Sequence, residues 1–281
     1  MQPFRVGIIG GMGFIGEYLI KKLGDNPKNS VNVFLNKTQP KTKIGGVEYF
    51  QIDENFENNL RDLDCLIILS QPNRKLIERI IGSSIRIKKI IYASTLLLYG
   101  NSRTPVDENF EIQPLNEYEK EKALEEKMLI DFSGRKDPLL TIARIANVYG
   151  DVKNRGVVQK IIMSVLHGEE FTVNNNGQQI RDYIFVEDVV NYLSYLVDRK
   201  PEERIEVFNI CTGEGISIKQ LISLVEDLTL KKIIHKDGSQ AAEKESIIGD
   251  NRKIAEVSKM KPKYDIREGL KKTYRNYLKS I

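Results

Sequence analysis

The sequence predicts an α/β fold in which a doubly wound parallel sheet is covered by helices on both faces. Apolar, strand-like runs alternate with helical stretches through the first half of the chain. A glycine-dense segment, "GIIGGMGFIGEYL" (residues 7–19), stands where the first strand would pass into the first helix. After about residue 150 the alternation becomes irregular, with the turn-rich "NNNGQQ", and we expect a smaller α/β lobe there.

The individual elements follow from the hydrophobic pattern. Strands are predicted in the first half over residues 4–9, 31–35, 47–52, 66–69, 90–93 and 139–143. Helices are predicted over 74–81 and 117–132, and residues 204–211 should return to the first sheet as a strand. We expect a sheet of roughly six or seven strands, with ligands bound beyond the carboxyl ends of the strands.

Three glycines suit a ligand at the first turn. Gly10 can make the tight turn, Gly13 lets the backbone approach a ligand, and Gly16 lets helix and sheet pack closely. The N–H groups that open the following helix would then point at a pyrophosphate. The spacing Gly10-x-x-Gly13-x-x-Gly16 in this context predicts a Rossmann-type dinucleotide site, although a turn that serves packing alone would also favour glycine.

Composition argues against several other classes of protein. The 281 residues contain no apolar run long enough for a bilayer and no signal region at the N-terminus, so we expect a cytoplasmic protein without membrane contact. The net charge of +4 comes from interleaved bases and acids, which argues against nucleic acid. Cys65 and Cys211 should be buried thiols, and His167 and His235 lack ligand-spaced partners, so no metal site is expected.

Candidate chemistry appears in the middle of the chain. The segment "YASTLLLYG" (residues 92–100) leaves a strand and places Ser94 and Thr95 at the end that should face a cofactor. Further on, Tyr118-x-x-x-Lys122 puts a phenol and an ammonium on one helical face. The cation should lower the pKa of Tyr118 and suit it to general acid–base work, with Thr95 bonding the same substrate oxygen. The alternative is a solvated, charged helical face.

These motifs belong to an ordered set that spans nearly the whole chain. The set consists of the glycine turn, "YASTLLLYG", "YEKEK", "RIANVYG" (144–150), "RDYIFVEDV" (181–189) and "FNICTGEGISIKQL" (208–221). Together they resemble the extended short-chain dehydrogenase/reductase family, and within it the nucleotide-sugar epimerases, dehydratases and ketoreductases.

The resemblance implies a domain organisation and partners. It implies an NAD(P)-binding Rossmann domain over residues 1–153 and about 182–212, with a nucleotide-sugar-binding lobe over 154–181 and 213–281. The substrate would be a nucleotide-linked sugar. A homodimer is implied through the Tyr118 helix and helix 74–81, where Leu124, Met128 and Leu129 offer apolar surface unless they pack on the sheet.

The resemblance also implies roles for individual residues. Tyr118 would be the catalytic acid/base, Lys122 would tune it and hold the nicotinamide ribose, and Thr95 would bind the reacting sugar oxygen. The implied cofactor contacts are Gly10, Gly13, Phe14, Ile15, Gly16, Asn36, Lys37, Asp53, Leu69, Ser70, Tyr118 and Lys122. The implied substrate contacts are Ser94, Thr95, Asn147 and Arg181. Asp53 and Asn147 could instead serve only turns, and Arg181 could pair with a nearby acid.

Departures from the family pattern favour particular reactions. Thr95 is followed by Leu96 and Leu97 where 4,6-dehydratases carry an acidic pair, so a dehydratase is not expected. The second strand ends without the acid that grips the ribose of NAD. Its loop instead offers Asn36, Lys37, Lys41 and Lys43 to a 2′-phosphate, which favours NADP, with NAD as the alternative.

Three functional hypotheses remain. The first is an NADPH-dependent 4-ketoreductase acting on a 4-keto-6-deoxy nucleotide sugar, favoured by the missing strand-end acid and by a short connection over residues 70–90 that encloses less of the sugar. The alternative is an NAD-dependent nucleotide-sugar 4-epimerase. A non-catalytic NADP sensor is a third hypothesis, which the retention of Tyr118, Lys122 and Thr95 disfavours.

Overall fold

The computed structural model describes residues 2–36, 40, 44–83, 86–135, 138–239 and 244–280. The chain divides into two compact units. Unit 1 comprises Met1–Leu98, Asn116–Arg144 and Val190–Phe208, and unit 2 comprises Tyr99–Leu115, Ile145–Val189 and Asn209–Ile281. The sequence analysis assigned residues 99–115, 145–153, 182–189 and 209–212 to the first domain, whereas this division places all four segments in unit 2.

Unit 1 is built on a seven-stranded sheet with the order β10-β6-β5-β4-β1-β2-β3. The strands are β1 (Phe4–Ile9), β2 (Asn29–Leu35), β3 (Val47–Gln51), β4 (Cys65–Ile68), β5 (Lys89–Thr95), β6 (Leu139–Ile145) and β10 (Ile205–Ile210). The five strands β1 to β5 pair in parallel, with Val6 of β1 opposite Val31 of β2 and Cys65 of β4. The predicted doubly wound parallel sheet is confirmed.

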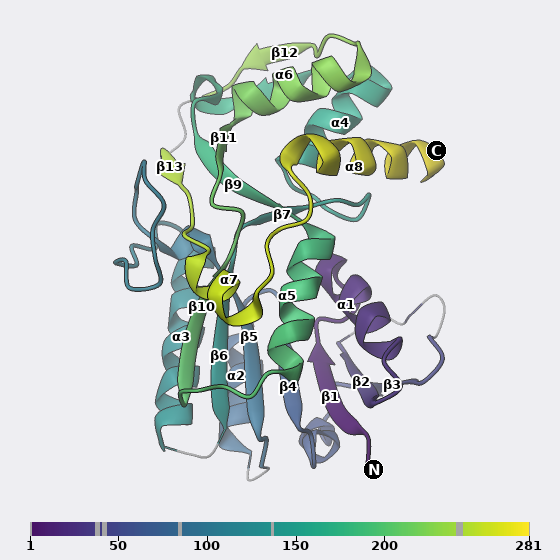
Figure 1. Cartoon of the computed structure of the whole chain (residues 1–281), viewed down its shortest axis with the longest axis vertical. Coiled ribbons are helices and arrows are strands. Elements are labelled where there is room, and N and C mark those ends of the chain that lie inside the picture. Colours follow the sequence, from purple (N-terminus) through teal and green to yellow (C-terminus); the bar gives the residue numbers. More distant parts are fainter. Residues whose placement is uncertain are drawn as a thin grey trace. The chain divides into compact units, whose positions relative to one another are not determined.

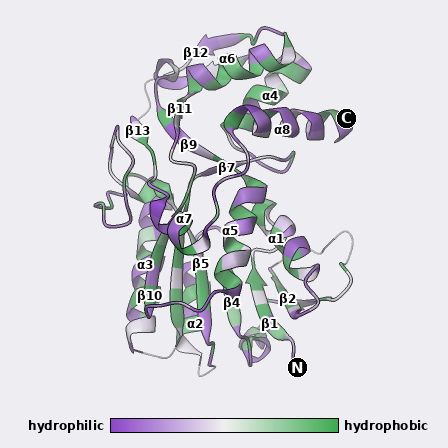
Figure 2. Ribbon diagram, viewed as in Figure 1, coloured by the Kyte–Doolittle hydropathy of each residue, from purple (hydrophilic) through white to green (hydrophobic). Residues whose placement is uncertain are grey.

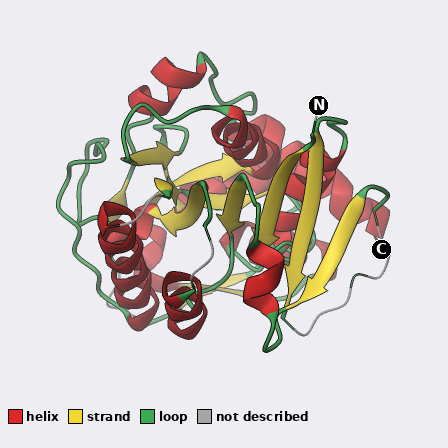
Figure 3. Cartoon of the chain, turned by 90° about the horizontal axis from the view of Figure 1, so that it is seen from below, coloured by secondary structure: helices red, strands yellow, loops and turns green. Residues whose placement is uncertain are grey.

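Helices cover both faces of this sheet, as Figure 3 shows. They are α1 (Phe14–Gly24), α2 (Arg74–Gly82), α3 (Glu117–Arg135) and α5 (Val186–Asp198), with the short 3-10 turns η1 (Phe56–Leu60) and η2 (Leu96–Leu98) (Figure 1). Because both faces are covered, the central strands are hydrophobic along most of their length, as β1 and β2 are in Figure 2.

Two helices of unit 1, α2 and α3, begin at side-chain caps. The Oδ1 atom of Asn73 accepts the N–H of Leu76 at 3.1 Å and opens α2, and the Oδ1 atom of Asn116 accepts the N–H of Glu119 at 2.9 Å and opens α3. The predicted helices 74–81 and 117–132 therefore begin at the expected residues and run one and three residues longer than predicted.

The apolar side of α3 packs inward. Leu129 belongs to the main core cluster with Tyr92 and Ile142, and Met128 packs against that cluster. The sequence analysis offered Leu124, Met128 and Leu129 either as dimer surface or as sheet packing. Leu129 and Met128 pack with residues of the sheet, whereas Leu124 is half-buried and lies outside this cluster. The homodimer itself stays a prediction, which sedimentation at micromolar concentration would test.

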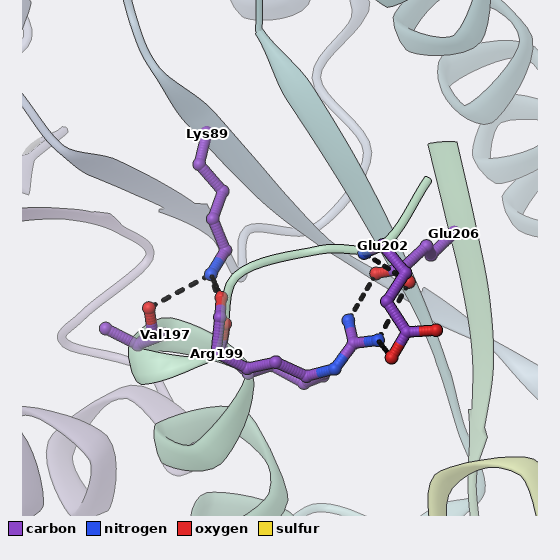
Figure 4. Close-up of polar contacts among 6 residues, drawn as sticks. Lys89, Val197, Arg199, Glu202 and Glu206 are labelled. Carbon is purple, nitrogen blue, oxygen red and sulfur yellow. Dashed lines mark hydrogen bonds and ion pairs between the residues drawn. The ribbon is translucent and has the colours of Figure 1, made fainter. Parts of the chain in front are cut away.

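A buried lysine closes the amino end of β5 (Figure 4). The Nζ atom of Lys89 donates to the carbonyl oxygens of Leu196, Val197 and Arg199 at the end of α5, the last two at 3.0 and 2.6 Å. Arg199 in turn holds the carboxylate of Glu206 through two hydrogen bonds of 2.6 and 3.0 Å. The cation satisfies carbonyl groups that the end of a helix leaves unpaired.

Unit 2 is a mixture of short strands and helices. Strands β7 (Asn147–Tyr149), β9 (Ile180–Phe185), β11 (Gly215–Ser217) and β13 (Ser246–Ile247) form a four-stranded sheet, and β8 (Phe171–Val173) pairs with β12 (His235–Asp237). The remaining elements are α4 (Val157–His167), η3 (Asn174–Gly177), α6 (Ile218–Thr229), α7 (Arg252–Ser258) and α8 (Ile266–Ser280). In the part of the chain described, no helix is both long and apolar enough to span a bilayer.

Candidate functional site

The glycine turn after β1 is shaped by the absence of side chains. Gly10 has a φ of +78°, and a Cβ atom there would lie 2.7 Å from the backbone nitrogen of Ser70. A Cβ at Gly16 would lie 2.5 Å from the carbonyl oxygens of Gly10 and Gly11. Helix α1 then begins behind Gly13, which supplies no side-chain cap. The first turn of α1 therefore keeps its N–H groups for a ligand.

A cavity of about 620 Å³ opens at this turn within unit 1. Its lining residues are Ile9, Gly10, Gly11, Met12, Gly13, Phe34, Leu35, Asn36, Ile52, Ser70, Asn73, Lys75, Leu76 and Arg79. Four predicted cofactor contacts, Gly10, Gly13, Asn36 and Ser70, are among them.

The other predicted contacts lie beside the cavity or outside the described residues. Phe14, Ile15 and Gly16 form the first turn of α1, and the N–H of Leu69 bonds the Ile9 carbonyl oxygen at 2.9 Å. Lys37, like Lys41 and Lys43, lies outside the residues that the structure describes.

Asp53 and Arg79 differ from expectation in their relation to this cavity. The Asp53 carboxylate accepts the N–H of Asn55 at 2.9 Å, which is the turn-forming alternative, and Asp53 is not among the lining residues of this cavity. Arg79 does line it. Its guanidinium binds Glu57 at 2.6 and 3.0 Å and lies 5.2 Å from the centre of the Phe56 ring. Sequence reasoning missed Arg79, because nothing local distinguishes it from other helical arginines.

Lys122 joins α3 to two neighbouring segments. Its Nζ atom donates to the carbonyl oxygen of Ala93 on β5 at 2.9 Å and to that of Ser70 after β4 at 3.2 Å. Only 3% of Lys122 is exposed, whereas 37% of Tyr118 is exposed. The phenol is thus accessible on a helix that a buried lysine holds against the carboxyl ends of the strands.

Thr95 ends β5 close to this attachment point. Its Oγ1 atom accepts the N–H of Leu97 at 3.2 Å, so its own hydroxyl hydrogen can be donated elsewhere. The neighbouring Ser94 is buried, and its Oγ atom has no hydrogen-bond partner among the described residues. Two hydroxyl groups therefore stand at the strand end where the sequence placed them.

The electrostatics of the site differ from the sequence expectation. Burial raises the pKa of Tyr118, and the carboxylates of Glu125 and Glu119 raise it further. We expected Lys122 to lower it. Burial lowers the pKa of Lys122 to about 8, against the opposing influence of Glu125 and Glu126. Burial, reinforced by these carboxylates, therefore keeps Tyr118 a neutral phenol near neutral pH.

Those carboxylates are site residues that sequence reasoning missed. Glu125 accepts hydrogen bonds from the Tyr92 hydroxyl and from the Asn73 N–H, and Glu126 binds the guanidinium of Arg144 at 2.8 and 3.2 Å. The run "YEKEKALEEK" looks like a solvated face. The available signal was Arg144, because a charge inside an apolar strand requires a partner.

Unit 2 contains a cavity of about 710 Å³. Asn147 and Arg181, the two predicted diphosphate contacts, both line it, together with Lys160, Gln179 and Tyr183. The Nη1 atom of Arg181 donates to the Ile180 carbonyl oxygen at 2.8 Å. The amide, phenol, lysine and guanidinium groups of this wall suit a polar, anionic ligand, and Glu169 and Glu170 also line the cavity.

The two cysteines take no part in these sites. Cys65 and Cys211 are both buried free thiols, as the sequence predicted. Burial raises the pKa of Cys65 to about 12 and raises the pKa of Cys211 well above its ordinary value. Neither thiol is therefore a reactive thiolate near neutral pH.

Comparison with known proteins agrees with this arrangement. The sequence pattern of the NAD dependent epimerase/dehydratase family matches residues 71–211. UDP-glucuronic acid decarboxylase 3 of Arabidopsis thaliana is 27% identical over a match that covers 96% of this chain and 88% of that protein.

Solved structures are similar along nearly the whole chain. UDP-glucose 4-epimerase from Thermotoga maritima with UDP-glucose is 26% identical, with a TM-score of 0.85 over 98% of this chain and 99% of that one. UDP-glucose 4-epimerase from Thermus thermophilus in complex with NAD is 20% identical, with a TM-score of 0.87 over 99% and 100% of the two chains. At 20% identity, the similarity to the T. thermophilus enzyme shows a shared fold.

Proposed function

The chain belongs to the NAD-dependent epimerase/dehydratase family, and on that premise we propose that it is an NAD-dependent 4-epimerase of a nucleotide sugar. The observation that carries the proposal is the attachment of Lys122. It bonds the strand end beside Thr95 and the Ser70 loop of the glycine-turn cavity, with Tyr118 one helical turn away. Similarity to a UDP-glucose 4-epimerase over nearly all of both chains supports this choice.

The residues around the glycine turn fit a dinucleotide. The space that a Cβ at Gly10 would fill and the uncapped start of α1 suit a pyrophosphate. Bound NAD would supply the oxidant for the sugar carbon, together with a positive ring that favours the Tyr118 phenolate.

The NAD-dependent family to which the chain belongs favours NAD over the NADP expected from the sequence. In the described cavity wall, the charge of Arg79 is compensated by Glu57 at 2.6 Å. The lysines on which the NADP expectation mainly rested lie outside the described residues. A 2′-phosphate would thus meet Lys75 as the uncompensated cation among the described lining residues.

The chain's own groups divide the acid–base work. The Thr95 hydroxyl donates a hydrogen bond to the sugar 4-oxygen, since its oxygen already accepts from Leu97. Tyr118 removes the proton of the sugar 4-hydroxyl when carbon 4 is oxidised and returns it when carbon 4 is reduced. Lys122 holds the ribose beside Tyr118. The unit 2 cavity binds the nucleotide diphosphate, with Arg181 and Asn147 at the phosphates.

A 4-ketoreductase is the second candidate. The same three groups would protonate a forming alkoxide, and the neutral Asn36 at the end of β2 is the observation that favours it. The family and the T. maritima relative favour the epimerase.

One experiment separates the two. Purified protein is analysed by mass spectrometry for retained nucleotide, then incubated with UDP-hexoses and UDP-hexuronic acids without added cofactor. We expect retained NAD and interconversion at carbon 4. Loss of NADPH absorbance with a 4-keto-6-deoxy nucleotide sugar, and no interconversion, would reverse the assignment. Tyr118→Phe should retain the nucleotide and lose about 10²- to 10⁴-fold in rate, whereas a sensor would lose nothing.

A further inference from the structure

A second polar side chain on α3 ties this helix to its neighbours. Glu125 is three residues after Lys122, and only 2% of it is exposed. One carboxylate oxygen accepts the Tyr92 hydroxyl of β5, and the other accepts the N–H of Asn73 at 2.5 Å. The two bonds compensate the cost of burying a carboxylate at this depth.

The two hydrogen bonds of Glu125 join the same two segments as those of Lys122. Lys122 bonds β5 at Ala93 and the β4–α2 loop at Ser70, and Glu125 bonds the same strand and the same loop at Tyr92 and Asn73. Both loop residues line the glycine-turn cavity. An anion and a cation on one helical face thus fix the cofactor loop relative to the strand that carries Thr95.

The same residues connect the two charges. The Nζ atom of Lys122 lies 4.5 Å from the centre of the Tyr92 ring, whose hydroxyl donates to Glu125. The other titratable groups around Lys122 are Tyr118 and Glu126 of α3, and Glu126 is already paired with Arg144 of β6. Glu125 has no ion pair in the described part of the chain, and its charge acts on Lys122 and on the phenols of Tyr92 and Tyr118.

We propose that Glu125 is a positioning residue for this site, whose buried carboxylate holds the cofactor loop against α3 and serves as the counter-charge of the Lys122 ammonium. The inference rests on the proposed function for its catalytic meaning. Glu125 would act through Lys122 and the loop, without touching substrate or cofactor.

The test measures the titration of Lys122 directly and needs neither cofactor nor substrate. The ¹³Cε resonance of Lys122 is followed against pH in lysine-labelled full-length protein and assigned by its loss in Lys122→Met. Glu125→Gln should move the midpoint to lower pH, because the supporting negative charge is gone. Tyr92→Phe keeps the charge and should leave the midpoint in place. Glu117→Gln, an exposed carboxylate of the same helix, is the matched control.

The outcomes are distinct. An unchanged midpoint in Glu125→Gln, or an equal shift in Tyr92→Phe, would overturn the counter-charge. If Glu125→Gln does not fold, the wild-type Asn73 amide decides the matter, since an N–H that donates to a buried carboxylate should exchange slowly. Fast exchange at Asn73 would sink the proposal.

A kinetic measurement links the inference to turnover. In Glu125→Gln the alkaline limb of the rate profile should move to lower pH, with roughly tenfold lower rate beyond it for each unit of displacement. Tyr92→Phe should keep the limb. Failure of the epimerase proposal would appear as absent turnover with the Lys122 titration still displaced, so the two failures can be told apart.

Discussion

A buried lysine lies at each end of β5: Lys89, the first residue of the strand, and Lys122 of α3, which bonds Ala93 near its carboxyl end. The two ammonium groups differ in how many hydrogen-bond donors they have left for a ligand. Lys89 at the amino end is 6% exposed and Lys122 at the carboxyl end is 3% exposed. Burial lowers the pKa of both. Burial and the direction of the pKa shift therefore do not distinguish the two lysines.

Their hydrogen bonds separate them. Lys89 donates to three carbonyl groups, which uses all three N–H bonds of its ammonium on the end of α5. Lys122 donates to two carbonyl groups and has the half-exposed Tyr118 one turn away. A perturbed pKa therefore marks a functional lysine only where a donor and an accessible reacting group remain beside it.

The largest expected effect concerns catalysis at the carboxyl end. Lys122→Met should lose about 10²- to 10⁴-fold in turnover, the range for an acid–base group and its support, while circular dichroism shows an intact fold. If Lys122→Met kept a turnover within threefold of wild type, Lys122 would be no more functional than Lys89.

The next effect is a pH dependence of stability. Burial lowers the pKa of Lys122 from 10.5 to about 8, so between these values the unfolded chain binds the proton and the folded chain does not. The contribution of Lys122 to the free energy of unfolding therefore rises by about 3 kcal/mol between about pH 8 and about pH 10.5. The same contribution is lost when the pH falls back through this range. Urea unfolding of wild type and Lys122→Met across this range checks it. Parallel curves would contradict the shift.

At the amino end the effect should be on stability alone. Lys89→Met leaves three carbonyl groups of α5 without their donor and should lower the free energy of unfolding by about 2 kcal/mol. Turnover per folded molecule should equal wild type. A loss of turnover larger than the loss of folded protein would mean that the two ends of β5 are coupled.

The smallest effect belongs to the adjacent lysine. Lys88 is 70% exposed and pairs with Asp64 at 2.6 Å. Because water screens such a pair, Lys88→Ala should change the free energy of unfolding by less than about 1 kcal/mol and leave turnover unchanged. Lys88→Ala serves as the control for Lys89→Met. A larger loss of unfolding free energy in Lys88→Ala would show that exposure does not predict how much each lysine contributes to stability.

Most of the fold could be predicted from local patterns. The predicted strand 4–9 matches β1, and the predicted starts of α2 and α3 match the structure because Asn73 and Asn116 cap them. The glycine turn was also readable, since a positive φ and a close backbone approach both select glycine. The roles of Tyr118, Lys122 and Thr95 stay predictions, on which the variants above bear.

The electrostatics of the site could not be predicted in this way. Glu125 and Glu126 lie in a run of alternating charges, which usually indicates solvent. Their burial depends on partners far along the chain: Asn73 is 52 residues away, Tyr92 is 33 away and Arg144 is 18 away. Asp53 illustrates the same limit, because its carboxylate bonds the turn beside it and Arg79 takes the cavity wall.

The sequence by itself determined the alternation of strands and helices, the open turn at Gly10 and the phenol and ammonium four residues apart on one helix. These properties depend on neighbours within a few residues, where periodicity and steric exclusion act. Tertiary structure alone decided which lysine is saturated, which carboxylates are buried and in which direction the pKa of Tyr118 moves, because desolvation and charge pairing are set by groups that only folding brings together.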